Sequence, residues 1–150
     1  MANTYSALYY HIIFSTKGRV GWLKPDIEQR VWEYVGGIGR QNKPVALQVG
    51  GFDDHIHALV SAPTSLAPSK IAQLLKGDSS LWIHTEFPEL REFAWQDGYG
   101  AFTVSKSNLS DVIRYIQNQR EHHQRQSFQT EYLEFLEKHG IEYDERYLWG

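Results

Sequence analysis

The sequence contains no cysteine. This absence excludes disulfide bonds and thiolate metal ligands, and it favours a cytoplasmic setting. A run of about 18 apolar residues, the length that a membrane-spanning helix needs, is also missing. The first residues are polar and lead directly into an alternating segment, so we expect no signal peptide.

An excess of basic residues is missing as well. The 150 residues carry a formal net charge of −3, whereas proteins that bind phosphate backbones normally present a basic surface. Residues 1–125 hold 13 Lys and Arg against 12 Asp and Glu, while residues 126–150 hold two against six. We therefore expect an acidic C-terminal tail over residues 126–150, and the nearly neutral remainder keeps a nucleic acid partner open.

The composition that is present is that of a globular protein. Hydrophobic residues make up 41% and charged residues 22% of the chain, and no repeat or linker interrupts it. We expect one domain over residues 1–150. The five Trp, nine Tyr and seven Phe suit base stacking, but a hydrophobic core is their more common use.

The spacing of apolar residues predicts the order of the secondary structure. Alternation predicts strands, and helical spacing predicts helices, with acidic residues on the exposed side of the last one. Asn108 and Asp111 resemble a capping box before the third helix. The order βαββαβ indicates an α+β, ferredoxin-like antiparallel sheet with additional C-terminal helices. The predicted strands are residues 5–16, 45–50, 55–62 and 99–105, and the predicted helices are residues 25–41, 71–84, 109–125 and 129–139.

Two histidines lie in the third predicted strand. Because side chains alternate along a strand, His55 and His57 project from the same face. Neutral imidazoles bind metal ions, and a pKa near 6.5 keeps them neutral at cytoplasmic pH. Asp53 and Asp54 could orient them. The alternative, two surface histidines after a simple Gly-Phe-Asp-Asp turn, stays open because a His-x-His motif alone is a weak signal.

A tyrosine and a glutamine share one stripe of the helix predicted at 109–125. Tyr115 and Gln119 are one turn apart, at the flank of the apolar face. A phenol can attack a phosphodiester and form a phosphotyrosine, aided by a divalent cation on His55 and His57 with Gln119 as a third ligand. Alternatively, Tyr115 is a rim residue and Gln119 is solvated, and histidines such as His122 and His123 are common on a polar helix surface.

Four stretches together resemble a known family. They are distinctive in this order, and they extend over almost the whole chain. The family is that of the small single-tyrosine transposases of bacterial insertion sequences, within the His-hydrophobe-His (HUH) nuclease superfamily. The stretches are YHIIFSTK at 10–17, DHIH at 54–57, WQDGYGAFTVS at 95–105 and YIQNQ at 115–119.

The resemblance implies a transposase that cleaves and rejoins single-stranded DNA at hairpin-bearing element ends. Tyr115 would take the 5′-phosphate and free a 3′-hydroxyl, and His55, His57 and Gln119 would hold a divalent metal ion, Mg²⁺ or Mn²⁺. It implies a homodimer with active sites shared between subunits, no nucleotide cofactor, no membrane partner, and a bacterial protein of the cytoplasm associated with the nucleoid. Within the domain, residues 109–125 would form the catalytic tyrosine helix.

Four cations are candidates for contacts with DNA phosphates. Lys17 and Arg19 follow the first strand, Lys76 lies in the second helix, and Lys106 precedes the tyrosine helix. Phosphate contacts of this kind position a protein on nucleic acid without reading its sequence. Each of the four could equally be an ordinary solvated cation.

Three other functions remain open from the sequence. The first is a host-adopted enzyme that processes genomic hairpins with the same chemistry. The second is a metal-dependent nuclease in which water attacks and Tyr115 is structural. The third is a non-catalytic protein that binds DNA hairpins.

Overall fold

The computed structural model describes residues 3–42 and 44–150, with side chains at all of these positions except 39–42. Lys43, part of the predicted stop between a helix and a strand, lies outside the described residues. The strands are β1 (Leu8–Ser15), β2 (Val45–Phe52), β3 (His55–Ala62) and β4 (Gly100–Val104). The helices are α1 (Pro25–Asn42), α2 (Pro68–Glu86), α3 (Leu109–Gln117), α4 (Gln119–His122), α5 (Phe128–Lys138) and α6 (Glu145–Leu148).

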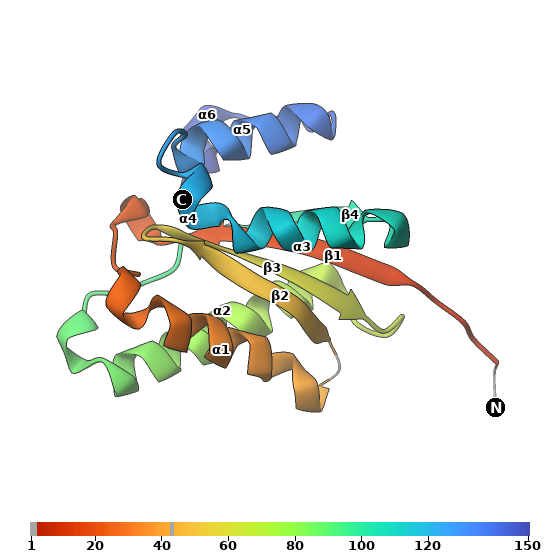
Figure 1. Ribbon diagram of the computed structural model, residues 1–150, viewed down its shortest axis with the longest axis horizontal. Coiled ribbons are helices and arrows are strands. Elements are labelled where there is room, and N and C mark those ends of the chain that lie inside the picture. The colour runs from red at the N-terminus through yellow and green to blue at the C-terminus, as the bar shows by residue number, and fades with distance from the viewer. Residues whose placement is uncertain (1–2, 43) are drawn as a thin grey trace.

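The four strands form one antiparallel sheet in the order β2-β3-β1-β4. With α1 after β1 and α2 after β3, this is the predicted ferredoxin-like arrangement, which is confirmed. Helices α1 and α2 cover one face of the sheet, and the helices that follow β4 lie on the other side (Figure 1). The sheet is thus the middle layer of the molecule.

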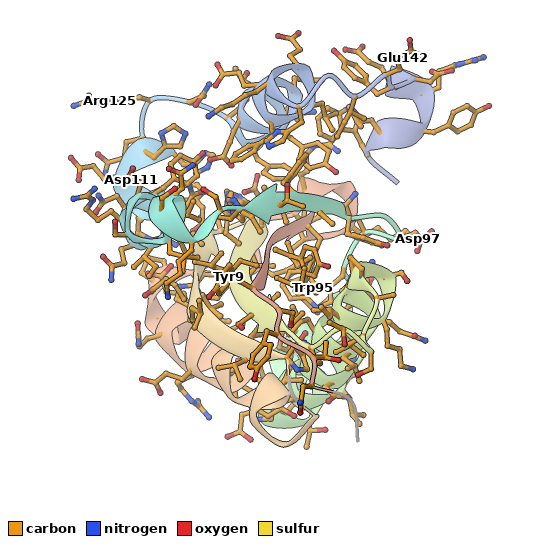
Figure 2. The ribbon with its side chains drawn as sticks, turned by 90° about the vertical axis from the view of Figure 1, so that its right-hand side faces the viewer. Tyr9, Trp95, Asp97, Asp111, Arg125 and Glu142 are labelled. Atoms are coloured by element: carbon orange, nitrogen blue, oxygen red, sulfur yellow. The ribbon has the colours of Figure 1, made fainter. Side chains whose placement is uncertain are left out.

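The larger hydrophobic core lies between the sheet and the pair α1 and α2. Ile12 and Phe14 of β1 and Ile56 of β3 point into it and are fully buried. Trp95, which lies between the sheet and α2 (Figure 2), packs edge-on against Phe14 and donates a hydrogen bond to Ser79 of α2 at 2.9 Å. Burying side chains of this size contributes about 1.5–3 kcal/mol each, so this face holds the sheet rigid.

The opposite face of the sheet is covered by α3 and α4 over β2 and by α5 over β1 and β4. Ile13 of β1 and Phe102 of β4 pack there against a stripe of α5 formed by Phe128, Tyr132 and Leu136. Because of strand alternation, the residues of β1 and β3 that do not enter the larger core point to this side. The histidines of the two central strands are among them.

Besides shifts of one to three residues at several element ends, three features differ from the predictions. Strand β2 continues to Phe52, so the turn before His55 contains only Asp53 and Asp54. The helix predicted at 109–125 is interrupted at Asn118, whose φ of −98° and ψ of 15° separate α3 from α4. The short helix α6 was not predicted, and the Asp144 side chain caps its first turn.

The predicted capping box before α3 does not form. The Asn108 side chain accepts no hydrogen bond from the helix, and Asp111 pairs with Arg114 one turn later. Both residues of that pair are exposed, so the pair contributes little.

Among the described residues, no helix is long and apolar enough to span a bilayer.

Helix α3 lies close to β2 because position 50 has no side chain. A Cβ added to Gly50 would lie 2.6 Å from the Ile116 carbonyl oxygen and 2.9 Å from its side chain. These distances are shorter than van der Waals contact, and the nearest atom belongs to backbone that cannot rotate away. Gly50 therefore allows the tyrosine helix to approach the sheet.

Replacing Gly50 with alanine should destabilise the protein by about 1–3 kcal/mol, because the added methyl forces α3 away from β2. Chemical denaturation measures the change. Gly37→Ala in α1 is the matched control, since no atom lies within 4 Å of its Cβ position, and it should be neutral or stabilising by up to about 1 kcal/mol. Equal stability of the two variants would contradict the close approach.

Candidate active site

The histidine pair is buried. His55 begins β3, His57 follows two residues later, and both side chains are 0% exposed. In the register of the sheet, His55 lies opposite Ser15 and His57 opposite Ile13 of β1. The alternative of two surface histidines is therefore wrong.

Each of these imidazoles is held through its Nδ1 atom. His55 Nδ1 lies 2.8 Å from Asp54 Oδ1, and His57 Nδ1 lies 2.7 Å from His11 Nε2 of β1. A carboxylate oxygen only accepts, so His55 carries its proton on Nδ1 and keeps the Nε2 lone pair free. Orientation of this kind through the second nitrogen is typical of metal-binding histidines.

Helices α3 and α4 bring the other two predicted residues to the same place. The Tyr115 ring lies 5.7 Å from that of His57, and the buried Gln119 places Oε1 2.9 Å from His55 Nε2. The single chain thus gathers all four predicted site residues, although 60 residues separate His55 from Tyr115.

Arg120 ties α4 to the rest of the fold. Its guanidinium lies 2.6 Å from Glu28 Oε2 and 2.9 Å from Asp53 Oδ1, and it stacks over the Phe52 ring. Burial would raise the pKa of Asp53, but Lys24 and Arg120 outweigh it, and the pKa is lowered. Asp53 therefore anchors the segment that carries Gln119, and Asp54 alone orients a histidine.

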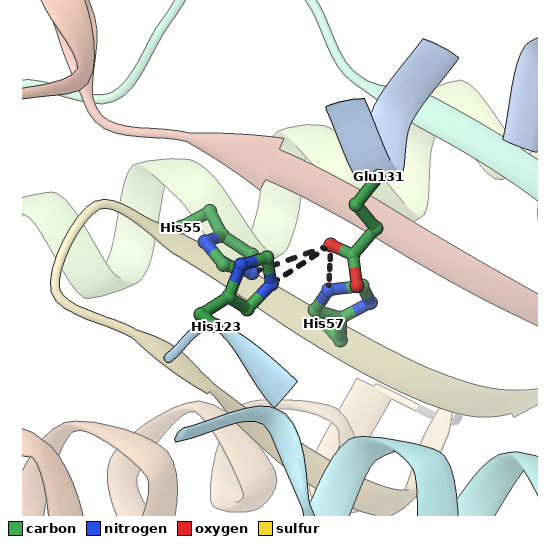
Figure 3. Close-up of side chains that lie close together, drawn as sticks. All are labelled: His55, His57, His123 and Glu131. Carbon is green, nitrogen blue, oxygen red and sulfur yellow. Dashed lines mark hydrogen bonds and ion pairs between the residues drawn. The ribbon is translucent and has the colours of Figure 1, made fainter. Parts of the chain in front are cut away.

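Glu131 of α5 completes the cluster and was not predicted. It is 2% exposed. Its Oε1 lies 3.0 Å from His57 Nε2, 3.2 Å from His123 Nε2 and 3.5 Å from His55 Nε2 (Figure 3). Its Oε2 accepts hydrogen bonds from Gln119 Nε2, at 3.0 Å, and from the Tyr115 hydroxyl.

The expectation that the acidic residues of the last helix are exposed is wrong for Glu131, although Glu134 and Glu137 are exposed. A signal was present in the sequence. Glu131 is three residues after Phe128 and four before Phe135, so helical spacing places it on the apolar stripe. An acid in that position indicates a buried partner.

His122, the last residue of α4, and His123 directly after it also face the site. The His123 side chain is 2% exposed and donates from Nδ1 to the Gln126 carbonyl oxygen at 2.6 Å. The His122 ring lies 5.5 Å from that of Tyr115. Its buried Nε2 lies 3.3 Å from Glu131 Oε2 but makes no hydrogen bond among the described residues. The interpretation of His123 as a residue of a polar helix surface is therefore wrong.

Burial and the Glu131 carboxylate control the protonation of this cluster. Burial lowers the pKa of His57 to about 4 although Glu131 opposes it, and burial also lowers the pKa of His11. Burial and Glu131 both raise the pKa of Tyr115. Burial would raise the pKa of Glu131, but His57 and His123 outweigh it and hold that pKa far below its usual range.

In metal-free protein, the His57 imidazole should titrate near pH 4, whereas the unfolded chain titrates near 6.5. The unfolded chain thus binds a proton that the folded chain does not, so stability should fall as pH drops from about 6.5 to about 4. Imidazole resonances followed by NMR in a chelator measure the midpoint. A midpoint at or above 6.5 would contradict the burial argument.

The four cations predicted to contact DNA differ in their surroundings. Lys17 and Lys106 are exposed, and Arg19 lies 5.3 Å from the centre of the Trp149 ring. Lys76 donates to the carbonyl oxygens of Asp97, at 2.8 Å, and Gly98, at 3.1 Å, and burial lowers its pKa. The ammonium of Lys76 therefore already supports a loop.

A ferredoxin-like antiparallel sheet with a buried His-hydrophobe-His pair beside a helical tyrosine defines the class of single-tyrosine HUH proteins. The sequence model of the family described as IS200-like transposase matches residues 4–119. The chain belongs to this family.

Individual relatives agree with this assignment. The transposase for insertion sequence element IS200 of Salmonella typhimurium is 31% identical over 127 residues, which cover 81% of this chain and 82% of the relative. The ISDra2 transposase TnpA of Deinococcus radiodurans is 27% identical over 119 residues, which cover 76% and 85%.

Two solved structures share the fold. One is a crystal structure described as a transposase from Deinococcus radiodurans R1, with a TM-score of 0.66, 25% identity, and coverage of 80% of this chain and 96% of that one. The other is a REP-associated tyrosine transposase bound to a REP hairpin, with a TM-score of 0.55, 13% identity, and coverage of 79% and 70%. At that identity the second likeness concerns the fold alone.

Proposed function

We propose that the protein is a DNA transposase that cleaves and rejoins single-stranded DNA at hairpin-bearing element ends through a 5′-phosphotyrosine intermediate. Family membership supports the reaction class. The observation that carries the proposal for this chain is the position of Tyr115 beside the buried imidazole of His57. A tyrosine that served only as a rim residue would not need this contact.

The donor atoms of the site fit a divalent metal ion. His55 has Asp54 on one nitrogen and the Gln119 amide oxygen on the other, so both of its nitrogens face atoms that only accept. Either a second proton on His55 or a metal cation between His55 Nε2 and Gln119 Oε1 resolves this conflict. His55, His57 and Gln119 would hold the ion, Mg²⁺ or Mn²⁺ by family resemblance, and it would polarise the scissile phosphate.

In the proposed reaction the Tyr115 oxygen attacks the phosphorus. The bond from phosphorus to the 3′-oxygen breaks, the tyrosine becomes esterified to the 5′-phosphate, and the departing oxygen takes a proton and becomes a 3′-hydroxyl. Attack by a 3′-hydroxyl on the phosphotyrosine runs these steps in reverse and forms a new phosphodiester bond. One phosphodiester is thus exchanged for another, and no nucleotide cofactor is consumed. The hydrogen bond from Tyr115 to Glu131 orients the phenol.

The Tyr115→Phe variant should lose the covalent adduct with a 3′-labelled DNA strand while it retains hairpin binding, because only the nucleophilic oxygen is removed. Denaturing gels measure the adduct, and a gel shift measures binding. Tyr5→Phe is the matched control, since Tyr5 is 92% exposed, and it should behave as wild type. An adduct that persists in Tyr115→Phe sinks the assignment of the nucleophile.

We also propose the homodimer with shared active sites that the resemblance implies. Tyr115 and His57 lie together within the single chain, so a shared site requires the tyrosine helix to be exchanged between subunits. Because α3 lies inside the chain, its exchange needs a hinge on each side, and the non-helical residue Asn118 between α3 and α4 is a suitable hinge on its C-terminal side.

A mixture of Tyr115→Phe and His57→Ala chains tests this exchange. Each variant alone should form no adduct in magnesium or manganese, since one lacks the nucleophile and the other a metal ligand. If sites are shared, a co-refolded equimolar mixture regains adduct formation at about a quarter of the wild-type level, because about half of the dimers are mixed and each mixed dimer has one intact site. A mixture as inactive as its components would assign each site to one chain.

The remaining features of the proposal concern the surroundings of the site. We propose that Lys17, Arg19, Lys76 and Lys106 contact DNA phosphates; of these, Lys76 would have to give up its bonds to Asp97 and Gly98. The chain would act as one domain over residues 1–150, in the cytoplasm and at the nucleoid, where its DNA substrate lies.

A further inference from the structure

We propose that Glu131 and His123 are also ligands of the metal ion, so that three imidazoles and one carboxylate surround it with Gln119 beside them. This rests on the metal site of the proposed function and extends it to α5 and to the segment between α4 and α5.

The spacing of the four donor atoms is that of a metal site. One atom each from His55, His57, His123 and Glu131 lies within 4.8 Å of all the others. The three Nε2 atoms lie 3.5, 3.0 and 3.2 Å from Glu131 Oε1. Ligands at about 2.0–2.1 Å from a tetrahedral ion are separated by about 3.3–3.4 Å. The distances to Glu131 Oε1 therefore already match a metal site, and binding an ion would draw together the donor atoms that are up to 4.8 Å apart.

Neutral imidazoles in the cluster present nitrogen lone pairs to other acceptors, which is the arrangement a cation would bind. His123 donates from Nδ1 to the Gln126 carbonyl oxygen, so the neutral ring presents a lone pair at Nε2. That lone pair faces two further acceptors, Gln119 Oε1 at 2.9 Å and Glu131 Oε1 at 3.2 Å. His55 is in the same position, with acceptors at both nitrogens. Either a second proton on each ring or one divalent ion in place of those protons satisfies all of these atoms.

The two carboxylate oxygens of Glu131 have different partners. Oε1 faces the three imidazoles, whereas Oε2 accepts from the Tyr115 hydroxyl and from Gln119 Nε2. The bond to Oε2 turns the Gln119 amide so that its oxygen points towards His55 and His123. Glu131 thus binds the ion through one oxygen and positions the nucleophile through the other.

This donor set also indicates the class of ion. Magnesium prefers oxygen ligands and water, whereas imidazoles suit manganese less well than they suit cobalt or zinc. Three imidazoles and one carboxylate therefore favour Zn²⁺ or Co²⁺, and Mn²⁺ over Mg²⁺. The complete set of ligands therefore disfavours Mg²⁺, the ion that oxygen-rich sites usually bind.

Titration of chelator-treated protein with CoCl₂, followed by visible absorption, tests the ligand set. Wild type should bind one ion, and Glu131→Gln and His123→Ala should each bind at least about tenfold more weakly with a changed spectrum. Glu137→Gln, an exposed acid of the same helix, is the matched control and should match wild type. Wild-type affinity and spectrum in Glu131→Gln or in His123→Ala would overturn the inference.

X-ray absorption of cobalt-loaded wild type gives a second test that does not depend on how a variant folds. Three coordinated imidazoles support the inference, and two overturn it. The adduct assay separates this inference from the proposed function. Adduct formation with only two imidazoles would overturn the ligand set alone, whereas three imidazoles without an adduct would overturn the transferase and leave the ligand set standing.

Discussion

The burial of one carboxylate among imidazoles organises the side of the sheet that faces α5. Moving an ion such as the Glu131 carboxylate out of water costs several kcal/mol, which good geometry and additional hydrogen bonds must offset. Its partners come from β3, from α3 and from the segment around α4. Helix α5 can therefore occupy its position only when all of these elements are in place, and Glu131 joins segments that the sheet alone would leave independent.

Much of the fold was predictable from the sequence because it depends on local periodicity. Alternation placed His55 and His57 on one face, and helical spacing placed Tyr115 and Gln119 on one stripe. Neither pattern shows that the two pairs meet. The two pairs meet because α3 packs against β2 over Gly50. The hydrophobic pattern of a sequence does not indicate such a close approach between backbones. Family resemblance supplied that step.

The residues that the sequence analysis missed are those whose environment is set by distant partners. Glu131 is 74 residues from His57 along the chain, and an acid in an amphipathic helix is ordinarily exposed. His123 was assigned to a continuous helix, but the break at Asn118 turns it towards His55. Both errors arise because tertiary contacts override local preference, and the position of Glu131 on an apolar stripe was the available warning.

The family match ends at residue 119, whereas the cluster continues to Glu131, twelve residues later. The sheet, the histidine pair, the tyrosine and the glutamine thus lie within the common part of the family, and the carboxylate of α5 lies beyond it. Under the proposed ligand set, a relative that has the common part but no acid at the corresponding place in its C-terminal helix would lose one metal ligand and the partner of its tyrosine. Metal-ion preference and tyrosine placement could then differ between members of the family that share the sheet and the histidine pair.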